Sequence, residues 1–132
     1  MVLYGSLMSF FNTQDELGIR DKLKLLGRCE LPGRLYNIGA YPGFKSLHEN
    51  HGSVQAELYQ LVDPQVLIKL DEFEDYIPDD VNASLYLRTL VSLKQFDIKA
   101  WVYIYNRPVL ESAYIRSGNW QQHLKDSSKN NC

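Results

Sequence analysis

Apolar and polar side chains alternate in several parts of the chain, which predicts β-strands. Residues 54–59 alternate between the two kinds, the pattern of a half-buried strand. Two longer β-rich runs, residues 85–93 and 96–105, are linked by Lys94-Gln95 and predict a long hairpin. At the N-terminus, the apolar residues 2–4 predict a short buried strand that ends at a turn.

A first helix is predicted from Thr13 to Leu26. Thr13 and Glu16 have the spacing of a capping box, leucines follow at helical intervals, and Gly27 can end the helix. The glycines and prolines of residues 29–43 favour short strands and bends over a helix.

A second helix is predicted to begin at Asp63-Pro64, as N-cap and first helical residue. With about 100° of rotation per residue, Glu74 falls in the same sector as four apolar residues, while Asp71 and Glu72 are expected to face solvent. A carboxylate on an apolar stripe loses water, which raises its pKa and suits proton transfer near neutral pH. Alternatively, the helix ends at Phe73 and Glu74 enters a solvated loop. The apolar residues are Val66, Leu67, Leu70 and Phe73.

The order of these elements predicts the fold class. Strands with two interspersed helices in 132 residues indicate a single α+β domain, whose curved sheet could close into a barrel. We expect this domain to cover residues 1–126 and the polar residues 127–132 to form a disordered tail.

Charge and composition exclude several partners. The net charge of -2 provides no basic field for nucleic acid or an anionic membrane, and no apolar run approaches the ~20 residues of a membrane span. We therefore expect a cytoplasmic protein. Cys29 and Cys132 are interpreted as free thiols, and the spacing of His48, His51 and His123 does not indicate a zinc site.

The turn Tyr4-Gly5-Ser6-Leu7 is a second candidate for function. A glycine-containing loop after a strand can present successive backbone N–H groups to a carboxylate or phosphate. By itself the pattern also fits a purely structural turn.

Together, these segments resemble the gamma-glutamylcyclotransferase-like family, in its AIG2-like branch, over residues 2 to about 105. Residues 2–8 are similar to its Tyr-Gly-Ser/Thr-Leu motif, and Leu70-Asp71-Glu72-Phe73-Glu74 to its Leu-Asp-x-x-Glu signature. Further similar segments, in order, are residues 26–28, 32–36, 39–42, 56–59, 86–88 and 100–105.

The resemblance implies a small mixed β-barrel with flanking helices and a cavity at one end. It implies that Tyr4, Gly5, Ser6 and Leu7 bind the α-carboxylate of a small gamma-glutamyl substrate, and that Glu74 is the acid/base. In the family reaction the α-amino group attacks its own γ-amide carbonyl, which releases an amine and 5-oxoproline. This intramolecular reaction requires neither a metal nor a cofactor.

Tyr86 and Arg88 lie on one face of the same predicted strand. They are candidates for hydrogen bonding to the substrate or for orienting Glu74. The alternative is a structural pair at the rim of the barrel.

The chain departs from the family pattern at two places. Ser9-Phe10-Phe11 stand where a basic residue and a glycine are common, and Asp75 stands where glycine is usual after the glutamate. These departures support an alternative function, a non-catalytic module that binds a small carboxylate in the same cavity.

Overall fold

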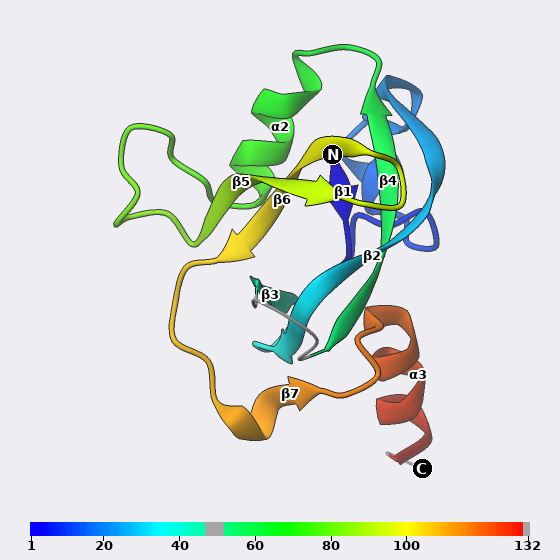
Figure 1. The fold of residues 1–132 in the computed structure, drawn as a ribbon, viewed down its shortest axis with the longest axis vertical. Helices are drawn as coiled ribbons and strands as arrows, with labels where there is room; N and C mark the ends of the chain where they lie inside the picture. The colour runs from blue at the N-terminus through cyan, green and yellow to red at the C-terminus, as the bar shows by residue number, and fades with distance from the viewer. Residues whose placement is uncertain (47–51, 131–132) are drawn as a thin grey trace.

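One long strand, β2, organises the main sheet of this protein, whose computed structural model describes residues 1–46 and 52–130 (Figure 1). The first part of β2, Leu23 to Pro32, pairs with β4, and its second part, Gly33 to Asn37, pairs with β3. β1 pairs with β4, and β7 pairs with β2. The strands of this sheet are β1 (Val2–Leu3), β2 (Leu23–Asn37), β3 (Pro42–Ser46), β4 (Ser53–Leu61) and β7 (Tyr114–Ile115).

The predicted hairpin is confirmed. β5 (Tyr86–Leu93) and β6 (Ile98–Tyr105) pair antiparallel along their whole length. The hairpin forms its own two-stranded sheet, and β6 lies near β1 and β3 without pairing with them.

The α+β class is confirmed, but the closed barrel is not. Every strand pairing among the described residues is antiparallel, and no ladder joins the hairpin to the main sheet. The two sheets therefore meet through side chains rather than through a continuous ring of strands.

The first predicted helix is wrong beyond its first turn. α1 spans only Thr13–Glu16, with Asn12 as an N-cap that makes no side-chain capping bond. Gly18 adopts φ +67°, a left-handed conformation that ends helices, and a 3₁₀ turn at Arg20–Lys22 then leads into β2. Two of the leucines that suggested a helix belong to β2, in which Leu23 is buried and Leu26 is exposed, whereas Leu17 is the C-cap of α1.

α2 spans Val66–Phe73 and begins slightly later than predicted. The Asp63 carboxylate accepts a hydrogen bond from the Gln65 N–H at 3.0 Å, so Asp63 caps the turn that leads into the helix. The predicted apolar stripe is confirmed, since Val66 and Leu70 are fully buried.

A third helix, which the sequence did not predict, reaches into the segment that was expected to form the tail. α3 spans Trp120–Asn130, so residues 127–130 are helical, whereas residues 131–132 lie outside the described chain. α3 lies at the opposite end of the molecule from α2 (Figure 1). Its polar sequence concealed the helix, because its anchor is a single buried residue, Trp120, stacked on His123 at 5.4 Å. His48, His51 and Cys132 also lie outside the described residues.

The hydrophobic core joins both sheets and α2. Val2 and Leu58 from the main sheet pack in one cluster with Leu70 of α2 and Val102 of β6. In the described part of the chain, no helix has the length and apolar character needed to cross a membrane.

Gly33 marks the point where β2 changes its partner, and we expect it to be intolerant of a side chain. A Cβ at this position would contact the Lys45 carbonyl oxygen and approach the Phe44 ring to 2.7 Å, on a backbone with φ +152°. Gly33→Ala should lower the free energy of unfolding by about 2 kcal/mol or more. Urea denaturation measures this loss.

Gly39→Ala is the matched control, because Gly39 also has a positive φ, +117°, but no atom lies within 4 Å of its added Cβ. It should show the backbone strain alone, about 1 kcal/mol. Equal losses in the two variants would contradict the steric argument.

Candidate active site

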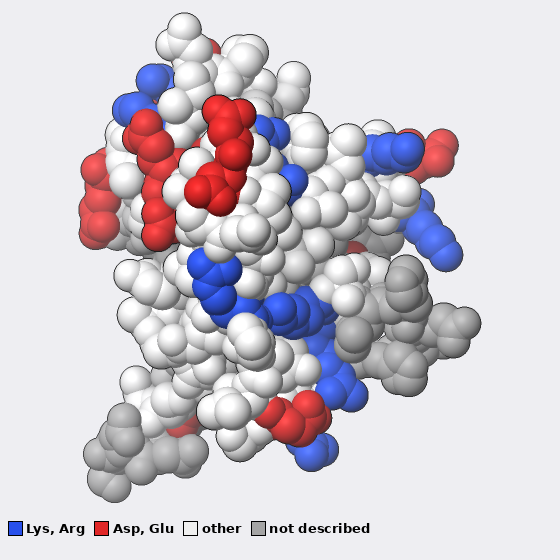
Figure 2. Space-filling view, turned by 90° about the vertical axis from the view of Figure 1, so that its left-hand side faces the viewer, with Lys and Arg blue, Asp and Glu red and all other residues white. Residues whose placement is uncertain are grey.

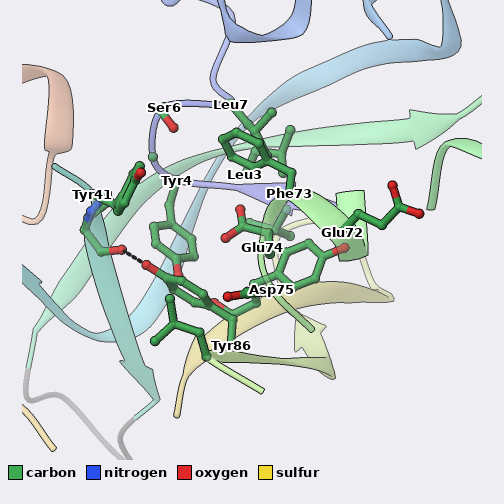
Figure 3. Close-up of a pocket in the computed structure, with 15 residues that line it drawn as sticks. Leu3, Tyr4, Ser6, Leu7, Tyr41, Glu72, Phe73, Glu74, Asp75 and Tyr86 are labelled. Atoms are coloured by element: carbon green, nitrogen blue, oxygen red, sulfur yellow. Dashed lines mark hydrogen bonds between the residues drawn. The ribbon is translucent and has the colours of Figure 1, made fainter. Parts of the chain in front are cut away.

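A cavity of about 340 Å³ lies where the turn after β1, the end of α2 and the β5–β6 hairpin meet (Figure 3). Its volume is in the range of small-molecule sites. Most of the residues that the sequence proposed for the site line it: Tyr4, Gly5, Ser6, Leu7, Glu74 and Tyr86. The remaining lining residues are Val2, Leu3, Tyr41, Pro42, Glu72, Phe73, Asp75, Leu85 and Tyr103.

Glu74 follows the last helical residue of α2 and turns its carboxyl group into this cavity (Figure 3). α2 does end at Phe73, as the alternative interpretation supposed, but Glu74 does not enter a solvated loop. Its N–H donates to the Leu70 carbonyl at 2.9 Å, so Glu74 continues the helical path as the C-cap. Burial raises the pKa of its carboxyl to about 8. Near neutral pH such a group can both take up and return a proton.

The Glu74 carboxyl has no hydrogen-bond partner among the described residues, although three tyrosines surround it. Burial is the main cause that raises the pKa of all three phenols, and the charge of Glu74 adds to it. Each hydroxyl donates elsewhere: Tyr4 to the Tyr103 carbonyl at 2.6 Å, Tyr86 to the Pro42 carbonyl at 2.8 Å and Tyr103 to Asp71 Oδ1 at 2.7 Å.

The turn at Gly5 offers unoccupied hydrogen-bond donors. It is closed by the Met8 N–H, which donates to the Gly5 carbonyl at 3.0 Å. Within residues 1–46 and 52–130, no acceptor takes a hydrogen bond from the N–H of Gly5, Ser6 or Leu7. Because all three residues line the cavity, these N–H groups are available to an anionic ligand.

Gly5 is required by close packing rather than by its φ angle. Its backbone is not in the left-handed region, but an added Cβ would lie 2.9 Å from Pro42 Cγ. Pro42 also holds the Tyr86 hydroxyl, so the turn and the wall of the cavity are in direct contact.

Arg88 does not line the cavity, unlike Tyr86 on the same strand. Its guanidinium forms a two-point bond to Asp71, with Nε–Oδ1 at 2.9 Å and Nη2–Oδ2 at 3.3 Å. The guanidinium also lies over the rings of Trp101 and Tyr76, at 4.5 and 5.4 Å. Arg88 is therefore not placed to contact a ligand in the cavity directly.

Two residues of this site were missed by sequence reasoning. Asp71 was expected to face solvent but is buried, because Arg88 and Tyr103 bind its carboxylate. Tyr103 lines the cavity but was not among the candidates that the sequence indicated. The sequence held an indication for each: Asp71 is the aspartate of the Leu-Asp-x-x-Glu signature, and Tyr103 lies on the inward-facing side of its strand.

The departures from the family pattern lie mainly outside the cavity. Phe10 and Phe11 do not line it and pack edge to face at 5.1 Å, with Phe10 largely exposed. Asp75 does line the cavity and adopts φ 57°, the left-handed region that favours glycine and that aspartate tolerates. The backbone there keeps a glycine-like conformation without a glycine.

No group of three or more potential metal ligands (His, Cys, Asp or Glu) occurs among the described residues. Cys29 is a free, buried thiol, as expected, and burial raises its pKa to about 11. It is therefore protonated at neutral pH and a weak nucleophile.

Comparison with known proteins covers almost the whole chain. The family model for gamma-glutamyl cyclotransferase, AIG2-like, matches residues 1–122. A Vibrio cholerae relative is 39% identical over 103 residues, which cover 76% of this chain and 79% of the relative. The Escherichia coli K12 gamma-glutamylcyclotransferase family protein YtfP is 30% identical over 119 residues, which cover 89% and 92% of the two chains.

The fold also has a counterpart among solved structures. An uncharacterised protein from Pyrococcus horikoshii superimposes with a TM-score of 0.71 and 19% identity, over 98% of this chain and 95% of that one. At this identity the likeness concerns the fold alone.

The raised pKa of Glu74 should make the stability of the fold depend on pH. Because the folded pKa, about 8, lies above the ordinary 4.5, the folded protein favours the protonated carboxyl. This contribution is complete below the ordinary pKa and is lost as the pH rises through about 8. Glu74→Gln removes the titration, so wild type should lose roughly 2 kcal/mol or more relative to the variant between pH 5 and pH 9. Urea denaturation across this range would refute the burial if the two stability curves stayed parallel.

Proposed function

Because this chain belongs to the gamma-glutamyl cyclotransferase, AIG2-like family, we propose that it releases 5-oxoproline and an amine from a small gamma-glutamyl amine or amide. The observation that carries the proposal is the Glu74 carboxyl, which lies in the cavity with a pKa of about 8 and without a hydrogen-bond partner in the described chain. It faces the cavity together with the turn whose N–H groups are unoccupied.

The N–H groups of Gly5, Ser6 and Leu7 bind the α-carboxylate of the substrate in this proposal. Among the described residues, the cavity lining contains no Lys, Arg or His, so a substrate carboxylate finds no cationic side chain there to pair with. Backbone N–H groups can hold an anion without such a side chain. This supports the binding role that the sequence assigned to the turn.

Glu74 acts on the amino group next to that carboxylate. As the carboxylate form it takes a proton from the α-ammonium, and the free amine attacks the γ-carbonyl carbon to close a five-membered ring. The tetrahedral intermediate needs a donor for its oxyanion. Tyr86 lines the cavity and is our candidate, and in this role its hydroxyl exchanges the Pro42 carbonyl for the oxyanion. Protonated Glu74 then gives its proton to the nitrogen of the leaving amine as the C–N bond breaks. The carboxylate so formed takes the second proton from the ring nitrogen and passes it to the amine, which leaves as an ammonium ion.

The charge of the cavity limits the kinds of amine that are favoured as leaving group. In the part of the lining that the structure describes, all charged residues are acidic: Glu72, Glu74 and Asp75. On the face shown in Figure 2, most of the acidic side chains gather on the upper part, and a band of Lys and Arg lies below them. A leaving amine with its own carboxylate would be repelled, so a neutral or cationic amine is favoured.

The alternative function, a binding module without turnover, has little support from the cavity. Of the departures that suggested it, only Asp75 lines the cavity, and the presumed base and binding turn are both present. We therefore retain the enzyme as our proposal.

Glu74→Gln should abolish most of the turnover. The amide keeps the size of the side chain but cannot accept the proton, and general acid/base catalysis contributes about 10²–10⁴-fold. We would incubate both proteins with a panel of gamma-glutamyl amides and follow 5-oxoproline by mass spectrometry. The rate should fall by about that factor, with KM nearly unchanged.

Glu16→Gln is the matched control, because Glu16 is exposed on α1 and does not line the cavity. Equal turnover by Glu74→Gln and wild type would rule out the mechanism. If wild type forms no 5-oxoproline from any amide yet still binds them, the binding module becomes the better interpretation.

Gly5→Val should weaken ligand binding more than it weakens the fold. The added side chain must displace Pro42, which lies 2.9 Å from the position of the Cβ and holds the Tyr86 hydroxyl. We expect at least a tenfold (~1.4 kcal/mol) loss of affinity for 5-oxoproline by calorimetry. Gly18→Val is the control: φ is +67° and no atom is within 4 Å, so it should cost stability without affinity. A similar affinity of Gly5→Val and wild type would show that the turn does not shape the site.

A further inference from the structure

A buried ion pair lies directly behind the candidate active site. The side chains of Arg88 and Asp71 are only 15% and 12% exposed and share two hydrogen bonds. The flat guanidinium is held between the rings of Trp101 and Tyr76. Such a pair has a fixed geometry, because both its partners and its packing restrict it.

The pair connects the two elements that carry the site. Asp71 belongs to α2, one helical turn before Glu74, and Arg88 belongs to β5. Asp71 also accepts the hydroxyl of Tyr103 on β6, whose carbonyl in turn accepts the hydroxyl of Tyr4. The end of α2 is thereby bonded to both strands of the hairpin and, through Tyr103, to the binding turn.

The same bonds keep the Tyr103 hydroxyl away from Glu74. This phenol senses the charges of Asp71, Glu74 and Arg88 together, so the four groups lie close to one another. If Asp71 did not accept this hydrogen bond, the Tyr103 hydroxyl would be free to donate one to Glu74. A hydrogen bond of that kind stabilises a carboxylate and makes it a weaker base.

We propose that Asp71 and Arg88 are positioning residues for Glu74: the pair fixes the end of α2 on the hairpin, binds Tyr103 away from Glu74 and cancels the charge of Asp71. The inference rests on the proposed role of Glu74 and adds Asp71 and Tyr103 to it. Neither Asp71 nor Arg88 lines the cavity, so they act through Glu74 and do not touch the substrate.

Charge cancellation has a testable signature. Burial is the cause that raises the pKa of Glu74, and an uncompensated charge on either member of the pair would add to this shift or oppose it. The other titratable groups that line the cavity with Glu74 come from several surrounding elements and are not themselves substituted in the experiment; of these, Tyr103 also bonds to Asp71. They are Tyr4 after β1, Tyr41 before β3, Glu72 and Asp75 at the end of α2, Tyr86 on β5 and Tyr103 on β6.

The experiment measures the pKa of Glu74 directly, by carbon NMR of protein labelled at the glutamate carboxyl groups. The Glu74 signal is the one that disappears in Glu74→Gln. Arg88→Met leaves the Asp71 charge uncompensated and should raise the pKa of Glu74 by ~0.5–1 unit, while Asp71→Asn leaves Arg88 uncompensated and should lower it by a similar amount. The double variant Asp71→Asn with Arg88→Met should titrate within ~0.3 unit of wild type.

Two controls separate positioning from a general structural role. Arg20→Met removes one member of an exposed pair, Arg20–Asp15 at 2.6 Å, and should leave the pKa of Glu74 unchanged. Arg88→Lys keeps the charge but loses the two-point bond, so it should preserve the pKa while lowering kcat.

Opposite shifts that cancel in the double variant support the proposal; no shift, or shifts in the same direction, would overturn it. If a single variant does not fold, the double variant decides: a fall in kcat of at least tenfold at constant KM supports positioning, and a wild-type kcat overturns it. Because NMR needs no turnover, a failure of the cyclotransferase proposal, seen as no product from wild type, remains distinguishable from a failure of this one.

Discussion

A carboxyl group held in a cavity without a hydrogen-bond partner is the constraint on which the candidate site depends. Desolvation disfavours the charged form of Glu74, so its pKa rises to about 8. The protein could remove this cost with one hydroxyl, and three phenols stand close enough to feel the charge. Each donates instead to an acceptor elsewhere, which leaves Glu74 free for an external partner.

The acceptors that hold these hydroxyls come from segments far apart in sequence. Pro42 begins β3, Asp71 lies on α2 and the Tyr103 carbonyl lies on β6. The state of Glu74 is therefore a property of the whole fold. The hairpin and the main sheet, which share no strand pairing in the described chain, are joined at the cavity by these bonds and by the core around Val102.

Local sequence patterns correctly predicted those helices and strands that are determined by local interactions. The alternation in β4, the hairpin and the apolar stripe of α2 each follow from the burial of one face, and each was confirmed. The first helix failed because Gly18 ends it and because long-range pairing with β4 makes residues 23–26 a strand. Helix α3 was not predicted for a related reason, since its buried anchor, Trp120, packs into a core that is formed by distant segments.

The same difference between local and long-range interactions decided which parts of the candidate site could be predicted. The turn and Glu74 were identified because a motif and an apolar stripe pointed to them, and both line the cavity. Arg88 was also identified as a candidate, but Asp71 and Tyr103 were not, because only the fold brings these three residues together from three separate elements. Three carboxylates within residues 71–74 then differ in their surroundings: Asp71 is paired, Glu72 is exposed, and Glu74 is half-buried without a hydrogen-bond partner among the described residues. Groups of the same chemistry acquire different roles from their environment, and the third combines access to the cavity with a raised pKa that suits proton transfer near neutral pH.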